Sequence, residues 1–243
     1  MVHVERVDLP SQSGPHPHLV AIAGKGGTIY LIDCVHMGHY LPNDDSLAVQ
    51  TIASSGGGIF GSMAYWNHNF YVLSNSSNDA LRQFFVHEGK LTLKAASGSH
   101  FPATAATPSI SANGARDGVL WVLRANDDRN AVLYAFDAVD ISRLLYDSEQ
   151  NPSRDRAGLG LHFNIPTITK GHVYVGAKRE VDVYGLLNRK TVGRSTGGGD
   201  GAYYSQCFYA AVAALRRQSS GVSYPRSLRV RLRPRGNRRR GKS

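Results

Sequence analysis

A repeat of about 50 residues runs through positions 17–187, and it limits the folds open to this chain. One strand-like run recurs at nearly regular intervals; its copies are 29–33, 81–85, 133–137 and 181–185. A run of β-branched and aromatic residues precedes each copy, at 19–23, 70–73, 120–123 and 173–176. Because one such unit cannot bury both of its faces alone, neighbouring units are expected to stack.

Two further sets of strands complete the predicted unit. Opening strands are expected at 62–66, 108–112 and 166–169, and closing strands at 47–52, 90–95 and 144–147. The opening strands are followed by turns rich in Asn, Gly or His, at 67–69, 113–114 and 170–171. The predicted total is 14 strands in four units, because the first unit lacks an opening strand and the last lacks a closing strand.

Four-stranded units repeated every 40–50 residues, approximately, are typical of a β-propeller. The sequence therefore predicts an all-β protein of about four antiparallel blades. Two interpretations stay open: a small or open ring, or the C-terminal part of a larger propeller. We favour the larger propeller.

The repeat residues resemble the quinoprotein-type propellers, also called pyrroloquinoline-quinone-like repeat proteins. The likeness rests on Val-Tyr-Val-Gly at 173–176, on Leu-Trp-Val at 120–122, and on third strands such as Leu-Tyr-Ala-Phe-Asp-Ala at 133–138 and Ile-Tyr-Leu-Ile-Asp at 29–33. The segments 37–40, 107–114 and 163–168 are similar to a bacterial secreted group of unknown function. The resemblance covers residues 17–187 and implies the propeller fold, with a periplasmic or secreted location.

The chain departs from this family at the residues that join blades. Family repeats follow the third strand with Thr-Gly and a tryptophan, whereas Asp33 and Asp137 are followed by neither. Trp66 and Trp121 stand on first and second strands instead, so the family's means of joining blades is expected to be degenerate. No ligand set for the quinone or its calcium is recognisable. An enzyme is therefore disfavoured, and a quinoprotein dehydrogenase that binds both groups is kept as an alternative.

The positive charge is concentrated at the end of the chain. Of 28 Lys and Arg, 14 lie in 188–243 with one acid, Asp200, while 1–187 holds the other 14 with 17 acids; the net charges are +13 and −3. We divide the chain into an N-terminal extension, 1–16, the blades, 17–187, and a Gly/Arg-rich tail, 188–243. The tail is expected to be disordered or not native coding sequence, with one short helix considered at 202–218.

An Arg-rich tail also permits binding to nucleic acid or another anionic surface. The residues that would form this basic patch are Arg229, Arg231, Arg233, Arg235, Arg238, Arg239 and Arg240.

Candidate ligand-binding groups within the blades are few. Arg154 and Arg156 could clamp an anion, although an ion pair between blades or a surface loop is the favoured explanation. Cys34, His36 and His39 have short metal-ligand spacing but supply no fourth ligand, so a loop without metal is favoured. Cys34 itself is expected to be a small buried hydrophobe. The acidic pairs at 44–45 and 127–128 lack the pattern of a calcium loop and are read as solvated turns.

These observations favour a non-catalytic propeller module that acts as a binding or scaffold surface, with an unknown protein or small-molecule ligand. The sequence contains no run of 18 apolar residues, so it predicts no transmembrane helix. Residues 1–18 lack the apolar core of a secretory signal, so the location stays open despite the family resemblance.

Overall fold

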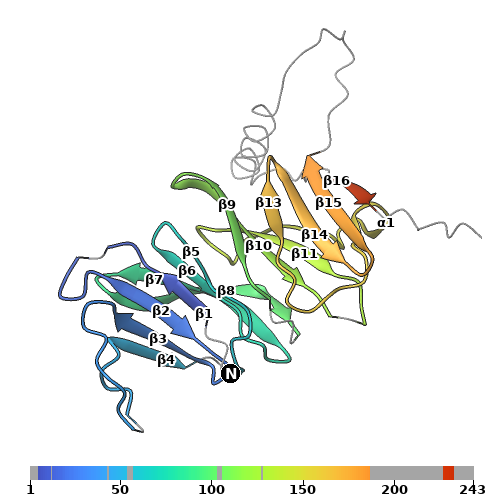
Figure 1. Ribbon diagram of the computed structural model, residues 1–243. Helices are drawn as coiled ribbons and strands as arrows, with labels where there is room; N and C mark the ends of the chain where they lie inside the picture. Colours follow the sequence, from blue (N-terminus) through green and yellow to red (C-terminus); the bar gives the residue numbers. More distant parts are fainter. Residues whose placement is uncertain are drawn as a thin grey trace, which may run out of the picture.

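The computed structural model describes residues 5–11, 13–42, 44–53, 57–102, 106–126, 128–186 and 227–232. They form four antiparallel four-stranded sheets, each a consecutive blade of the chain (Figure 1). Blade 1 consists of β1 (Glu5–Asp8), β2 (Leu19–Ala23), β3 (Thr28–Asp33) and β4 (Gln50–Ala53), and blade 2 of β5 (Ala64–Trp66), β6 (Asn69–Val72), β7 (Asp79–His87) and β8 (Lys90–Phe101). Blade 3 consists of β9 (Ser109–Asn113), β10 (Arg116–Arg124), β11 (Val132–Asp137) and β12 (Leu144–Asp147), and blade 4 of β13 (Thr167–Thr169), β14 (His172–Ala177), β15 (Glu180–Leu186) and β16 (Ser227–Leu232). A short helix, α1 (Pro152–Asp155), lies between blades 3 and 4.

Hairpin turns within the blades use the left-handed conformations that the sequence predicts. Asn67 and His68 between β5 and β6 have φ of 47° and 61°, and Lys170 and Gly171 between β13 and β14 have 48° and 74°. Two positive φ values in a two-residue loop match the right-handed twist of the strands they join. The predicted turns at 67–69 and 170–171 are thus confirmed; the third turn begins at Gly114, with φ of 60°, because Asn113 still belongs to β9.

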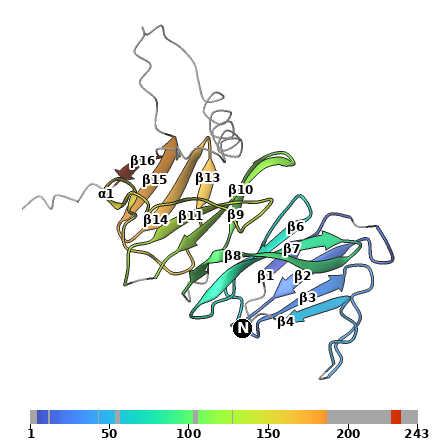
Figure 2. The same ribbon diagram turned by 180° about the vertical axis from the view of Figure 1, so that it is seen from behind.

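Three apolar cores hold consecutive blades together. The first joins blades 1 and 2 and includes Leu31 and Phe84; the second joins blades 2 and 3 and includes Leu81 and Phe136; the third joins blades 3 and 4 and includes Leu133. No core among the described residues joins blade 4 back to blade 1. Figures 1 and 2 show these two blades at opposite ends of the array. The predicted all-β fold of about four blades in an open propeller is confirmed.

Polar contacts reinforce the junction between blades 2 and 3. The Gln83 side chain, fully buried, donates from Nε2 to the Val139 carbonyl at 3.0 Å, and its Oε1 accepts from the Ile141 amide at 3.3 Å. The buried Tyr71 hydroxyl donates to the Ala138 carbonyl, and burial raises its pKa. These partners are backbone groups of the turn after β11, so the polar contacts of Gln83 and Tyr71 add to the side-chain packing between the two blades.

Trp66 also joins blades 2 and 3. Its Nε1 donates to the Gly114 carbonyl at 2.8 Å, and its ring lies so close to Gly118 that a Cβ there would be 2.6 Å from it. Tryptophan therefore does join two blades here, although from a first strand and not from the position that the quinoprotein-type repeats use. The ring fits at this junction because the facing strand carries a glycine.

The prediction of 14 strands is corrected, because the described residues form 16. β1 lies in the predicted N-terminal extension and pairs with β2, and β16 lies in the predicted tail and pairs with β15 from Val181 to Leu186. The last five residues of β16, Leu-Arg-Val-Arg-Leu, alternate apolar and basic in the sequence with the period of a strand. The helix considered at 202–218 lies outside the described residues.

Candidate protein-docking surface

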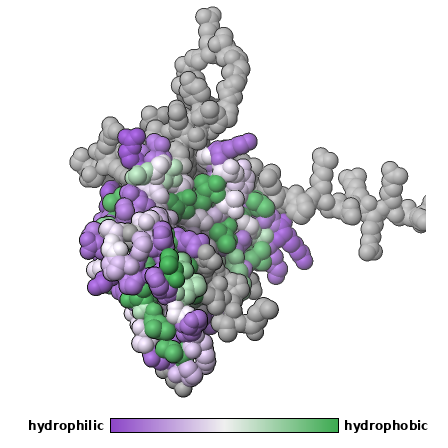
Figure 3. All heavy atoms as spheres, turned by 60° about the vertical axis from the view of Figure 1, so that its left-hand side comes forward, coloured by the Kyte–Doolittle hydropathy of each residue, from purple (hydrophilic) through white to green (hydrophobic). Residues whose placement is uncertain are grey.

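The connection from β3 to β4, residues 34–49, forms the most conspicuous apolar surface of blade 1. We call this segment the docking loop. Five of its large apolar side chains are exposed: Val35, Met37, Tyr40, Leu41 and Leu47. Tyr40 is 86% exposed, Val35 61% and Met37 59%. Figure 3 shows apolar residues on the lobe at the bottom of the view, where this loop lies.

Hydrogen bonds fasten both ends of the docking loop. At its start, one carboxylate oxygen of Asp33 accepts from the amides of Val35 at 2.8 Å and His36 at 3.3 Å. The Cys34 amide donates to the His18 carbonyl at 2.8 Å. At its end, the Val49 amide donates to the Leu31 carbonyl at 2.8 Å. The loop therefore leaves and rejoins the sheet at defined points.

The Asp33 carboxylate is buried and also contacts two histidines. His16 Nδ1 lies 2.9 Å from its Oδ2, and His36 Nδ1 lies 3.5 Å from the same oxygen. The hydrogen bond from His16, together with the amide of Val35, holds the pKa of Asp33 well below its usual range. An ionised Asp33 thus ties the N-terminal strand connection to the start of the docking loop.

The middle of the docking loop folds over itself. Gly38 has φ of +70°, and a Cβ at this position would lie 2.6 Å from the side chain of Leu47. Only glycine accepts both the left-handed backbone and this close approach without strain. Tyr30 donates from its hydroxyl to Asp45 at 3.1 Å, which anchors the returning arm of the loop to β3.

Cys34, His36 and His39 were considered above as residues with metal-ligand spacing. Within the described residues, no three His, Cys, Asp or Glu side chains are placed to hold an ion. Cys34 is exposed just past the end of β3, so the expectation of a buried cysteine in a strand is wrong. Asp44 accepts from the amide and hydroxyl of Ser46 at 2.7 and 2.9 Å, as expected of a turn residue.

The two candidate anion-binding arginines lie around α1, next to blade 4. Arg154 forms two hydrogen bonds to Asp155, at 2.6 and 2.5 Å, and Arg156 binds Glu149 at 2.8 Å. Each carboxylate raises the pKa of its arginine. The Asp155 carbonyl in turn accepts from Tyr184 of blade 4 at 3.0 Å. The carboxylates already occupy both guanidinium groups, and anion binding by these residues stays a prediction.

The tail arginines divide into two groups. The backbones of Arg229 and Arg231 belong to β16, where they pair with Tyr184 and Asp182 of β15. The other predicted residues of the basic patch lie outside the described part of the chain; they are Arg233, Arg235, Arg238, Arg239 and Arg240.

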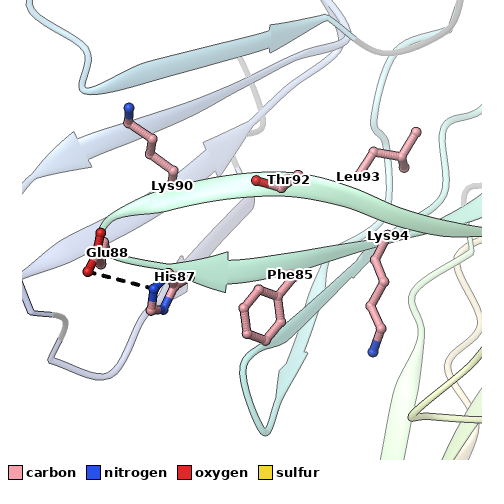
Figure 4. Close-up of a pocket in the computed structure, with 7 residues that line it drawn as sticks. All are labelled: Phe85, His87, Glu88, Lys90, Thr92, Leu93 and Lys94. Atoms are coloured by element: carbon pink, nitrogen blue, oxygen red, sulfur yellow. Dashed lines mark ion pairs between the residues drawn. The ribbon is translucent and has the colours of Figure 1, made fainter.

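A second surface feature is an open depression of about 610 Å³ on the β7–β8 hairpin (Figure 4). Figure 4 shows Lys90 and Leu93 extending from one side of the hairpin, and Phe85 and Lys94 from the other. The side chains therefore surround the edge of the sheet and do not enclose a ligand. Lys94 Nζ donates to the Val139 carbonyl at 2.8 Å, so this cation contributes to the junction between blades 2 and 3.

The chain is similar to several solved structures. A humanized mutant of the Chaetomium thermophilum Polycomb Repressive Complex 2 bound to the inhibitor GSK126 matches with a TM-score of 0.50 and 12% identity, over 79% of this chain and 40% of that chain. The WD40 domain of Toxoplasma gondii coronin matches with a TM-score of 0.45 and 14% identity, over 74% and 42%. The Cps50 (Swd1) β-propeller domain of Myceliophteria thermophila matches with 0.40 and 12%, over 75% and 53%.

Identities this low show the fold alone. No family model matches the chain, and no curated protein matches its sequence. The chain spans about 40% of the length of the first of these structures. No helix in the described ranges is both long and apolar enough to cross a lipid bilayer.

Proposed function

We propose that this chain is a non-catalytic propeller module that binds another protein through the docking loop. The observation that carries the proposal is the concentration of five large exposed apolar side chains in this one loop. Protein interfaces are built around such aromatic, methionine and aliphatic anchors, whereas monomeric surfaces rarely gather them. The fixed ends of the loop reduce the entropy lost when a partner orders it.

The test compares wild-type chain with a Met37→Ser/Tyr40→Ser variant as immobilised bait in an extract of the source cells. A Leu93→Ser/Phe163→Ser variant is the matched control, because Leu93 and Phe163 are 58% and 62% exposed outside the loop. A partner retained by wild type and control is then purified and titrated against all three. We expect at least a tenfold loss of affinity for the docking-loop variant only, as for truncation of an interface anchor. Equal affinity of all three would refute the proposal.

We also propose that the four blades belong to a ring larger than four. Its support is the open array, together with the match in fold to about 40% of a longer chain. We assign the repeat, more finely, to the quinoprotein-type group of bacterial secreted propellers. In favour of this, the third-strand aspartates Asp33 and Asp137 accept hydrogen bonds from the amides two residues later, at 2.8 and 2.9 Å. They stabilise the turn that follows, which gives this sequence position a physical role.

The two alternative functions predict different outcomes. A quinoprotein dehydrogenase would show a red-shifted absorbance after addition of pyrroloquinoline quinone and calcium; we expect no shift. A nucleic-acid-binding tail would lose binding when residues 233–243 are deleted, a truncation that leaves β16 in place. Deletion of all of 188–243 would remove that strand as well and would confuse the two effects.

A further inference from the structure

The third strand of each blade places alternate residues on opposite faces of the sheet. At the repeat position of Ile32, the other three blades carry Phe84, Phe136 and Tyr184. These side chains are 5%, 1% and 2% exposed, and each belongs to the core shared with the preceding blade. Phe136 and its neighbour Tyr134, for example, pack edge-on against Phe101 of blade 2. This repeat position therefore serves to contact the blade before it.

Blade 1 presents the same face with no preceding blade. Tyr30 of β3 lies between Ile22 of β2 and Thr51 of β4, each of which pairs with it across the sheet. Ile32, two residues after Tyr30, lies on the same face and pairs with Val20 of β2. Ile22, Tyr30 and Ile32 are only half-buried, whereas Val20 opposite Ile32 is buried, and none of these four residues belongs to the three described cores. On the other face of the same strand, Leu31 is fully buried against blade 2. We call the uncovered face the front face of blade 1.

Blade 4 presents the complementary face with no following blade. Val181 and Val183 of blade 4 occupy the same positions in the repeat as Leu133 and Ala135 of blade 3. Leu133 and Ala135 are buried in the core between blades 3 and 4. In blade 4, Val181 is 38% exposed and Tyr174 is half-buried, whereas Val183, which pairs with Tyr174, is 8% exposed. The backbone of β16 pairs with β15 and extends the sheet of blade 4 beyond Val181 and Val183. Blade 4 thus carries the apolar surface that accepts a next blade.

We propose that two copies of this chain close one eight-bladed ring, in which the back face of blade 4 in each copy packs on the front face of blade 1 in the other. The inference rests on the proposed membership of a larger ring and is independent of the docking loop. Every junction within the chain joins a back face to a front face, so the two uncovered faces are each other's complement. Propellers close with about four to eight blades, and two open arrays of four reach eight. A head-to-tail contact that closes at two copies also avoids open filaments.

The experiment is light scattering of the full chain during gel filtration, across a concentration series. Wild type is expected to have the mass of two chains and to dissociate on dilution. Ile32→Glu on the front face and Val181→Glu on the back face are each expected to be monomeric. Leu144→Glu is the control, because Leu144 is exposed to nearly the same extent as Val181, 37%, but lies on the third blade. It is expected to remain dimeric.

Mixing the two monomeric variants gives the sharpest result. One intact back face then meets one intact front face, so the mixture is expected to regain the mass of two chains although neither variant does alone. Where Ile32→Glu does not fold, by circular dichroism, Thr51→Arg at the rim of the same face replaces it. A monomeric wild type, a dimer that resists both face variants, or a mixture that stays monomeric would overturn the proposal. The docking-loop variant is expected to stay dimeric, so failure of one proposal is distinguishable from failure of the other.

Discussion

The junction between blades 2 and 3 and the front face of blade 1 use the same positions of the repeat, but only the junction is packed. At the junction, Tyr134 and Phe136 meet Phe101, and the buried Gln83 binds the turn after β11. On the front face, Tyr30 and Ile32 take the places of Tyr134 and Phe136 and remain half-buried. The blades are thus built alike, and the environment of a side chain depends on whether a neighbouring blade is present. The predictions below test this difference.

The largest expected effect comes from two adjacent residues of β3. Leu31→Ala removes a fully buried side chain from the core between blades 1 and 2 and should cost about 3 kcal/mol of unfolding free energy. Ile32→Ala removes a side chain of similar size from the uncovered face and should cost about 1 kcal/mol in dilute protein. Urea denaturation measures both. Equal losses would mean that the front face is already packed.

The next effect concerns the polar contacts of the covered junction. Gln83→Leu leaves the buried Ile141 amide without its partner, whereas the Val139 carbonyl keeps its hydrogen bond from Lys94, and the expected cost is about 2 kcal/mol. Gln50 is the control, because it binds the amide and carbonyl of Leu91 between blades 1 and 2 in a partly exposed place. Gln50→Leu should cost about half as much, since water can replace the lost side chain. A larger loss for Gln50→Leu in urea denaturation would contradict this order.

The smallest effect depends on pH and concerns the start of the docking loop. The folded-state pKa of Asp33 lies below its unfolded value, so its ionised form stabilises the fold above about pH 4. This contribution disappears as the pH falls from about 4 towards the folded pKa. The urea midpoints of wild type and Asp33→Asn should therefore differ at pH 6 and converge below pH 4. A difference that does not change with pH would show that the carboxylate charge plays no part.

The sequence alone predicts those parts of the fold that local residues specify. The repeat, the glycine and asparagine turns, and most strands of the inner blades follow from short patterns. β1 and β16 were missed for physical reasons. Glu5–Asp8 is mostly charged, and Ser227–Leu232 pairs with β15, which ends much earlier in the chain, at Leu186. An edge strand such as β1 needs only backbone pairing, so its side chains leave a weak signal, whereas β16 has a strand-like alternation but no sequence clue to its distant partner.

The candidate site was harder to predict, because apolar residues in a sequence normally indicate a core. The available signal was the length of the connection between the third and fourth strands of blade 1. In this blade β3 ends at Asp33 and β4 begins only at Gln50, whereas in blade 2 β7 ends at His87 and β8 begins at Lys90. The exposure of Tyr40, and the uncovered state of Ile32, depend on which neighbours are present in space. A single blade sequence holds no information about that.

The most direct test of the uncovered blade faces is hydrogen exchange of the backbone amides, read by mass spectrometry over a dilution series. β10 and β11, covered on both sides within the chain, are the internal reference. In dilute protein, β2 and β3 should exchange faster than the reference, and their protection should rise with concentration while that of the reference stays constant. Protection of β2 and β3 equal to that of β10 and β11 at every concentration would contradict the account.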